Sequence, residues 1–122
     1  MQSWIVPFPL DETARRLLLV LESAGIDPVF KIEHPGPTEP SGILFFLSRP
    51  DWISMIAQAD SRAVLEIPLR LYLAGTGKRT EVLYRTAREC LAPYPNLHLL
   101  EIGRWIDEGC VEVIDRLEDP VG

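Results

Sequence analysis

The chain has 122 residues, with 18 acidic against 12 basic side chains and a formal net charge of -6. An acidic balance of this size repels a phosphate backbone, and no run of Lys or Arg offsets it locally, so the composition argues against nucleic-acid binding. Hydrophobic residues make up 47% and charged residues 25%, which is ordinary for a globular protein. These values predict a single domain over residues 1–122, with one hydrophobic core.

The cysteine content and the length of the apolar segments indicate where in the cell the protein is expected. Cys90 and Cys110 are too few and too far apart for a disulfide-rich fold or a cysteine-based metal site, so we expect free thiols, with a mutual disulfide as the alternative. The first residues lack the basic and apolar regions of a signal peptide. Residues 17–21 and 43–47, the longest apolar runs, are much shorter than the roughly 20 residues that cross a bilayer. We therefore expect a cytoplasmic protein that does not insert into a membrane.

The first quarter of the chain predicts a strand, a helix and a second strand. Residues 4–6 favour β-structure and precede two prolines, which indicates an edge strand. Asp11 is the expected N-cap of a helix that ends at a C-terminal cap on Gly25. The apolar residues between them recur at helical spacing: Ala14, Leu17, Leu18, Leu21 and Ala24. Residues 29–34 then predict a strand, and the proline- and glycine-rich residues 35–42 a loop.

A second strand–helix pair follows. Residues 43–47 are continuously apolar, which is typical of a central strand covered on both faces. Ser48 and Asp51 match a capping box at the start of a short helix. That helix carries Trp52 and should end near Asp60.

The next segment predicts a β-hairpin. Residues 64–73 and 80–84 are strand-like, and the glycine-containing residues 74–78 join them. Pro68 lies inside the first run. It indicates an edge position, a bulge, or a strand that begins only at Leu69.

The last third predicts a helix that Asn96 caps and that runs toward Leu117. Its apolar residues form one stripe: Leu99, Ile102, Ile106, Cys110, Val113 and Leu117. A short strand at residues 111–113 is the alternative. Trp52 and Trp105 are expected in the core or in an interface. Because this stripe, with Trp105, exceeds what a small sheet needs to bury, we expect part of it to form a homodimer or partner contact.

These elements together predict an α+β fold, with a mostly antiparallel sheet and helices packed on one face. Several stretches of the chain are similar to stretches that a known family carries in the same order. They are Ala24-Gly25, Lys31-Ile32-Glu33-His34, Leu44 to Leu47 running into Ser48-Arg49-Pro50, Ile67-Pro68-Leu69-Arg70, Gly77-Lys78 and Tyr84. With them the chain resembles the domain of unknown function 302 family over about residues 4–88.

The chain departs from that family in two places. Ser48-Arg49 replaces the family's Gly-Asn before Pro50. Residues after Cys90 have no recognised counterpart, so about residues 96–118 are expected to form a helical extension. The resemblance implies a compact α+β domain, often a homodimer, and it implies no activity.

Four polar side chains are candidates for a ligand site: His34, Arg70, Tyr84 and Glu33. If the strands pair as predicted, these side chains converge on one face, where an arginine and a histidine suit a small acidic ligand. The alternatives are a histidine that anchors its loop through the backbone, and an arginine and a glutamate that are solvated. No metal or other cofactor is expected, because only His98 remains as a second imidazole.

The sequence leaves three functions open. The first is a self-associating binding or accessory domain. The second is a small enzyme or ligand-responsive subunit, in which His34 acts on an acidic small molecule that Arg70 and Tyr84 orient. The third is a structural interaction domain whose C-terminal helix docks a partner.

Overall fold

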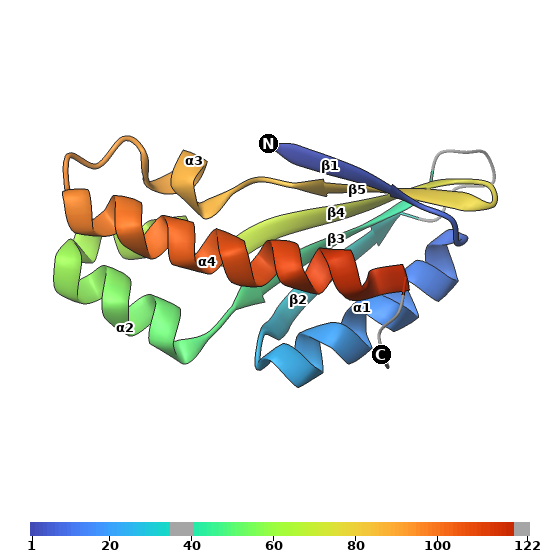
Figure 1. Cartoon of the computed structure of the whole chain (residues 1–122), viewed down its shortest axis with the longest axis horizontal. Coiled ribbons are helices and arrows are strands. Elements are labelled where there is room, and N and C mark those ends of the chain that lie inside the picture. The colour runs from blue at the N-terminus through green and yellow to red at the C-terminus, as the bar shows by residue number, and fades with distance from the viewer. Residues whose placement is uncertain (35–40, 119–122) are drawn as a thin grey trace.

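A computed structural model of the chain contains a five-stranded sheet with its long helices on one side (Figure 1). The structure describes residues 1–34 and 41–118. The strands lie in the order β1-β5-β4-β3-β2, and every neighbouring pair is antiparallel. The predicted α+β class with an antiparallel sheet is therefore confirmed.

The strands and helices alternate along the chain. They are β1 (Gln2–Val6), α1 (Leu10–Ala24), β2 (Asp27–His34), β3 (Gly42–Ser48), α2 (Pro50–Ala59), β4 (Leu69–Thr76), β5 (Arg79–Tyr84), α3 (Ala87–Leu91) and α4 (Leu97–Asp115). Two short 3-10 helices, η1 (Ser61–Glu66) and η2 (Arg116–Glu118), follow α2 and α4. Strands β1 and β2 form the edges, so the edge position expected for residues 4–6 is confirmed. Of the loop expected at residues 35–42, residues 35–40 lie outside the described residues.

Two predicted helix caps are confirmed and two are wrong. Gly25 closes α1 in the left-handed region, at φ 71°, and the Asn96 side chain accepts a hydrogen bond from the His98 amide. The two other helices begin differently. Pro9, not Asp11, precedes α1, and Ser48 still belongs to β3, where it pairs with Asp27.

The capping box occurs elsewhere, at a helix that the sequence analysis missed. Thr86 and Glu89 satisfy each other's backbone amides at the start of α3. Because α3 has only five residues, it carries no apolar periodicity that would have predicted it.

The hairpin is confirmed, but the strand before it is shorter than predicted. Residues 61–66 form η1, and β4 begins at Leu69, which is the third of the readings considered for Pro68. Gly77 makes the tight turn between β4 and β5 with φ 78°.

Helix α4 and the sheet share one core. The apolar stripe of α4 faces inward, which rules out a strand at residues 111–113. Its buried members are Leu99, Ile106, Cys110 and Val113, and Leu117 of η2 continues the stripe. Trp52 is also buried, at 2% exposed, whereas Trp105 remains 42% exposed. The buried part of the stripe therefore stabilises the domain itself, and Trp105 is the part of the expected contact that stays exposed.

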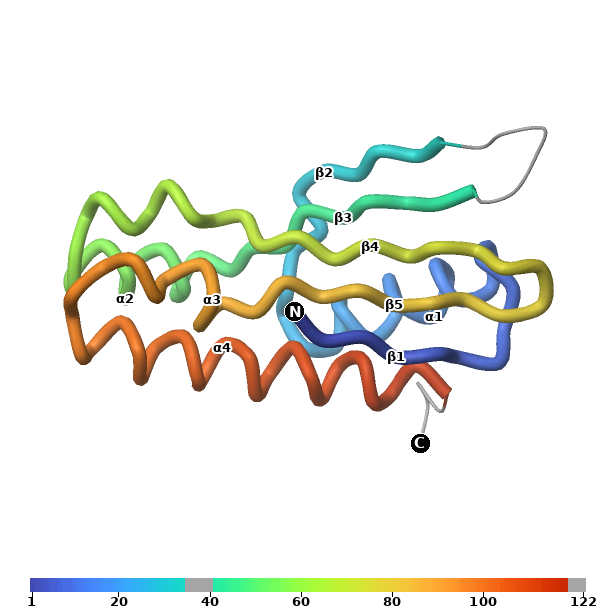
Figure 2. Tube along the Cα trace, turned by 90° about the horizontal axis from the view of Figure 1, so that it is seen from above, coloured from blue at the N-terminus to red at the C-terminus, as the bar shows by residue number. Residues whose placement is uncertain are grey.

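Within residues 1–34 and 41–118, no helix covers the opposite side of the sheet (Figures 1 and 2). Residues along each strand point alternately to the two sides. In β3, Phe45 is buried against the helices, while Leu44 and Phe46 on the other side are only half-buried. The prediction that residues 43–47 are covered on both faces is thus wrong. We call the uncovered side the open face; its apolar side chains are Ile5, Phe30, Ile32, Leu44, Phe46, Tyr72 and Leu83.

Candidate functional site

The structure does not bring the four predicted site residues together. His34 and Arg70 lie on the open face, but they are separated along the strands: His34 is level with Gly42, and Arg70 with Phe46. Glu33, the neighbour of His34, points to the helix side and pairs with Lys31 at 3.1 Å. The expectation that all four converge on one face is wrong, because consecutive strand residues necessarily point to opposite sides.

His34 is exposed and makes its contact with a side chain rather than with the backbone. Its Nε2 is hydrogen-bonded to the Tyr72 hydroxyl, and the two rings stack with centroids 5.7 Å apart. Gly42 lies beneath this pair. A Cβ atom at Gly42 would overlap the Tyr72 hydroxyl and crowd His34 Nε2, so the glycine makes room for the pair.

Tyr84 is fully buried and belongs to a structural network. Its hydroxyl donates to Asp107 of α4 at 2.6 Å, and burial raises the pKa of the phenol far above its ordinary value. The same carboxylate accepts from the amide of Ala87 at 2.6 Å and from the amide and Nε of Arg88, each at 3.2 Å. Asp107 thus joins β5, α3 and α4, and Tyr84 has no hydroxyl free for a ligand.

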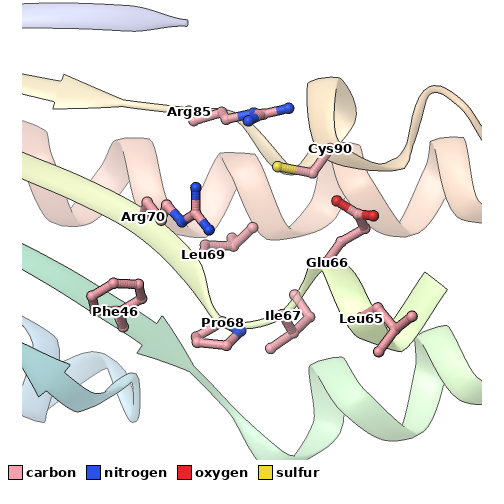
Figure 3. A pocket seen from close by; sticks show the side chains of 9 residues that line it. All are labelled: Phe46, Leu65, Glu66, Ile67, Pro68, Leu69, Arg70, Arg85 and Cys90. Atoms are coloured by element: carbon pink, nitrogen blue, oxygen red, sulfur yellow. The ribbon is translucent and has the colours of Figure 1, made fainter.

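Arg70 instead neighbours a second arginine. The amide of Arg85, which follows β5, donates to the Arg70 carbonyl at 3.4 Å. Both side chains line a pocket at the end of the open face, where η1 and α3 form its walls (Figure 3). Arg85 was not among the predicted site residues, because the alignment of the two arginines depends on the register of β4 with β5.

Both thiols are free, as predicted, and both are buried. Burial raises the pKa of Cys90 and raises that of Cys110 to about 11. Among residues 1–34 and 41–118, no three His, Cys, Asp or Glu side chains are grouped so that they could hold a metal ion. No helix in this part of the chain is both long enough and apolar enough to span a membrane.

These pKa shifts predict slow thiol chemistry. Because the thiolate is the reactive form, Cys110 should react with a disulfide reagent at pH 8 about 100-fold more slowly than an ordinary thiol. The rate should rise with pH toward the pKa of the thiol. Colour release from a chromogenic disulfide, in native and in guanidinium-unfolded protein, measures this. Rapid modification of both thiols in the native protein would contradict the prediction.

The geometry defines a class of protein: an antiparallel α+β domain with one helix-covered sheet face and one open face. No protein-family model and no curated protein sequence matches the chain. Among the solved structures that do match is the crystal structure of an uncharacterised conserved DUF302 protein from Bacillus stearothermophilus. It is 14% identical to the chain, with a TM-score of 0.86 over 95% of this chain and 96% of that one. The chain therefore has a DUF302-like fold, and the likeness extends beyond the first three-quarters in which the sequence resemblance lies.

Proposed function

We propose that the chain is a binding or accessory module that acts as a homodimer, with the open faces of two copies packed together. The observation that carries the proposal is the exposure of large apolar side chains on a whole sheet face. Ile5 is 58%, Phe30 59% and Ile32 47% exposed, and the other apolar side chains lie half-buried between them. Contiguous apolar surface of this kind is typical of an interface.

The strand register arranges the open face in three rows that cross the strands. The first row contains His34, Gly42, Ala74, Glu81 and Ile5. The middle row contains Ile32, Leu44, Tyr72, Leu83 and Ser3. The third row contains Phe30, Phe46, Arg70 and Arg85. The face is thus apolar in the middle, acidic at one end of β5 and basic at the other.

The arrangement of these rows favours a second copy of the chain as the partner that covers the open face. A two-fold axis along the middle row places the first row of one copy over the third row of the other and keeps each strand over its equivalent. Gly42 then lies over Phe46, and Glu81 lies over Arg85. A small residue faces a large one and an acid faces a base. Two sheets of this kind pack with their strands within about 30° of each other.

Charges on the open face should break the dimer. Phe30→Glu/Ile32→Glu changes two side chains that are exposed in the single chain, so we expect it to fold and to raise the dimer dissociation constant roughly 100-fold or more, about 2.7 kcal/mol. Sedimentation equilibrium at micromolar concentration measures this. Leu100→Glu, on the exposed side of α4 at 51% exposed, is the matched control and should leave the dimer intact. A wild-type monomer, or a double variant that remains dimeric, would refute the proposal.

A charge exchange tests the orientation of the two copies. Glu81→Arg and Arg85→Glu should each weaken the dimer, because each leaves like charges opposed across the interface. Glu81→Arg/Arg85→Glu together should restore association. Two harmful single changes without recovery in the double variant would exclude this two-fold axis.

Neither other function has equal support. The enzyme hypothesis requires Tyr84 to lie beside His34, so that both contact the same ligand. Tyr84 is instead buried on the other side of the sheet. Docking of a partner through the C-terminal helix would have to use its exposed side chains Leu97, Leu100 and Trp105, because the core contains most of its apolar stripe. We keep an acidic small molecule as the proposed ligand, but we no longer place it at His34 and Tyr84.

A further inference from the structure

We infer that the pocket between β4, η1 and α3 binds a small anion that carries an apolar group. The pocket is formed within one chain, so the inference does not depend on the dimer. Its lining residues, all shown in Figure 3, are Phe46, Leu65, Glu66, Ile67, Pro68, Leu69, Arg70, Arg85 and Cys90.

The positive charge comes from Arg70 and Arg85. Neither guanidinium makes a hydrogen bond or ion pair with any of the residues 1–34 and 41–118. By contrast, Arg49, Arg62 and Arg88 each pair with a carboxylate. Like charges on adjacent strands repel each other. Arg70 and Arg85 are both exposed and line the same pocket, so together they give it a local positive charge that suits an anion.

The other polar groups in the pocket leave its charge positive. Among the described residues, the lining contains one acid, Glu66, whose Oε2 accepts a hydrogen bond from the Tyr94 hydroxyl at 2.9 Å, which holds it toward Tyr94. Burial raises the pKa of Cys90, so this thiol stays neutral near pH 7. Two arginines therefore face one acid that is already hydrogen-bonded.

The walls and the size of the pocket define the rest of the ligand. Phe46, Ile67 and Pro68 supply apolar surface beside the two arginines. The cavity volume is about 190 Å³. That volume equals roughly six water molecules at ~30 Å³ each, well below the pockets of drug-sized ligands. The ligand class is a carboxylate or phosphate monoester with one ring or a short chain.

Phenyl phosphate, benzoate and inorganic phosphate are the probes, and isothermal titration calorimetry measures their affinities. Phenyl phosphate or benzoate should bind at least about tenfold more tightly than inorganic phosphate, because only they place an apolar group against the walls. Whichever binds more tightly identifies the phosphate or the carboxylate class. Equal affinity for all three probes, or equal binding of uncharged benzyl alcohol, would overturn the inference.

Arg70→Gln should weaken binding of the preferred probe by about tenfold or more, because it removes one of two charged donors. The matched control is Arg79→Gln, which removes an exposed arginine at the other end of β5, outside the pocket. An equal loss in both variants would show general charge attraction and would refute the site.

The experiments distinguish a failure of the dimer proposal from a failure of the pocket proposal. In the proposed dimer, Arg85 also faces Glu81 of the second copy, so Arg70→Gln is the cleaner change. Titrations are repeated with Ile32→Glu, which changes no lining residue and keeps the contact between Phe30 and Phe46 of the pocket. Binding that persists in this variant supports the pocket whatever its oligomeric state. Loss of binding there would mean that one chain does not form the site, which contradicts the inference.

Discussion

Asp107→Ala is expected to lower the free energy of unfolding by roughly 3–5 kcal/mol, the usual cost of removing one partner from a buried charged network. Asp107 is 3% exposed and accepts hydrogen bonds from the hydroxyl of Tyr84, the amide of Ala87, and the amide and side chain of Arg88. Alanine would leave the first two donors buried and unpaired. It would also remove hydrogen bonds that join α3 to α4.

Urea denaturation followed by circular dichroism measures the effect on Asp107→Ala. Tyr84→Phe keeps the ring and removes one donor, so it should lose about 1.5–3 kcal/mol. Asp115→Ala is the control, since this exposed carboxylate lies at the end of the same helix and should change stability by less than about 0.5 kcal/mol. A loss below about 1 kcal/mol for Asp107→Ala would show that the network does not stabilise the fold.

Trp52→Ala should lower the free energy of unfolding by about 3–5 kcal/mol, because it removes the largest fully buried side chain of the core. Trp52 lies on α2, the helix that packs against α4. Because the packed helices α2 and α4 surround the cavity that it leaves, they collapse into it only in part. Thermal unfolding and urea denaturation give the difference.

Trp105→Ala is the matched control for Trp52→Ala. Trp105 is the same residue type, but it is 42% exposed and its ring lies 5.7 Å from the Arg49 guanidinium carbon. We expect a loss near 1 kcal/mol, from partial burial and a weak cation–π contact. Equal losses at the two positions would contradict the burial pattern that separates them.

Several features of the fold follow from local sequence alone. Helical spacing of apolar residues predicted α1 and α4, and Gly25 and Asn96 mark their ends as expected. The glycines at residues 74–78 predicted the hairpin. These predictions succeed because backbone preferences and short-range capping act over a few residues. The α+β class, the antiparallel sheet and the likeness to the DUF302 fold were reached in the same way.

The candidate site depended on the pairing of distant strands. Register decides that His34 and Glu33 point to opposite sides, and that Tyr84 faces Asp107 and the core. The same register aligns Arg70 with Arg85, which no local pattern connects.

The sequence by itself determined which segments are helix or strand and how several of them end, because those choices are local. Only the tertiary structure decided which side of the sheet each residue occupies and which side stays uncovered. A side chain's face depends on hydrogen bonds between strands that are far apart in the chain, and a shift of one residue reverses it. The open face and the Arg70–Arg85 pocket are therefore products of strand pairing.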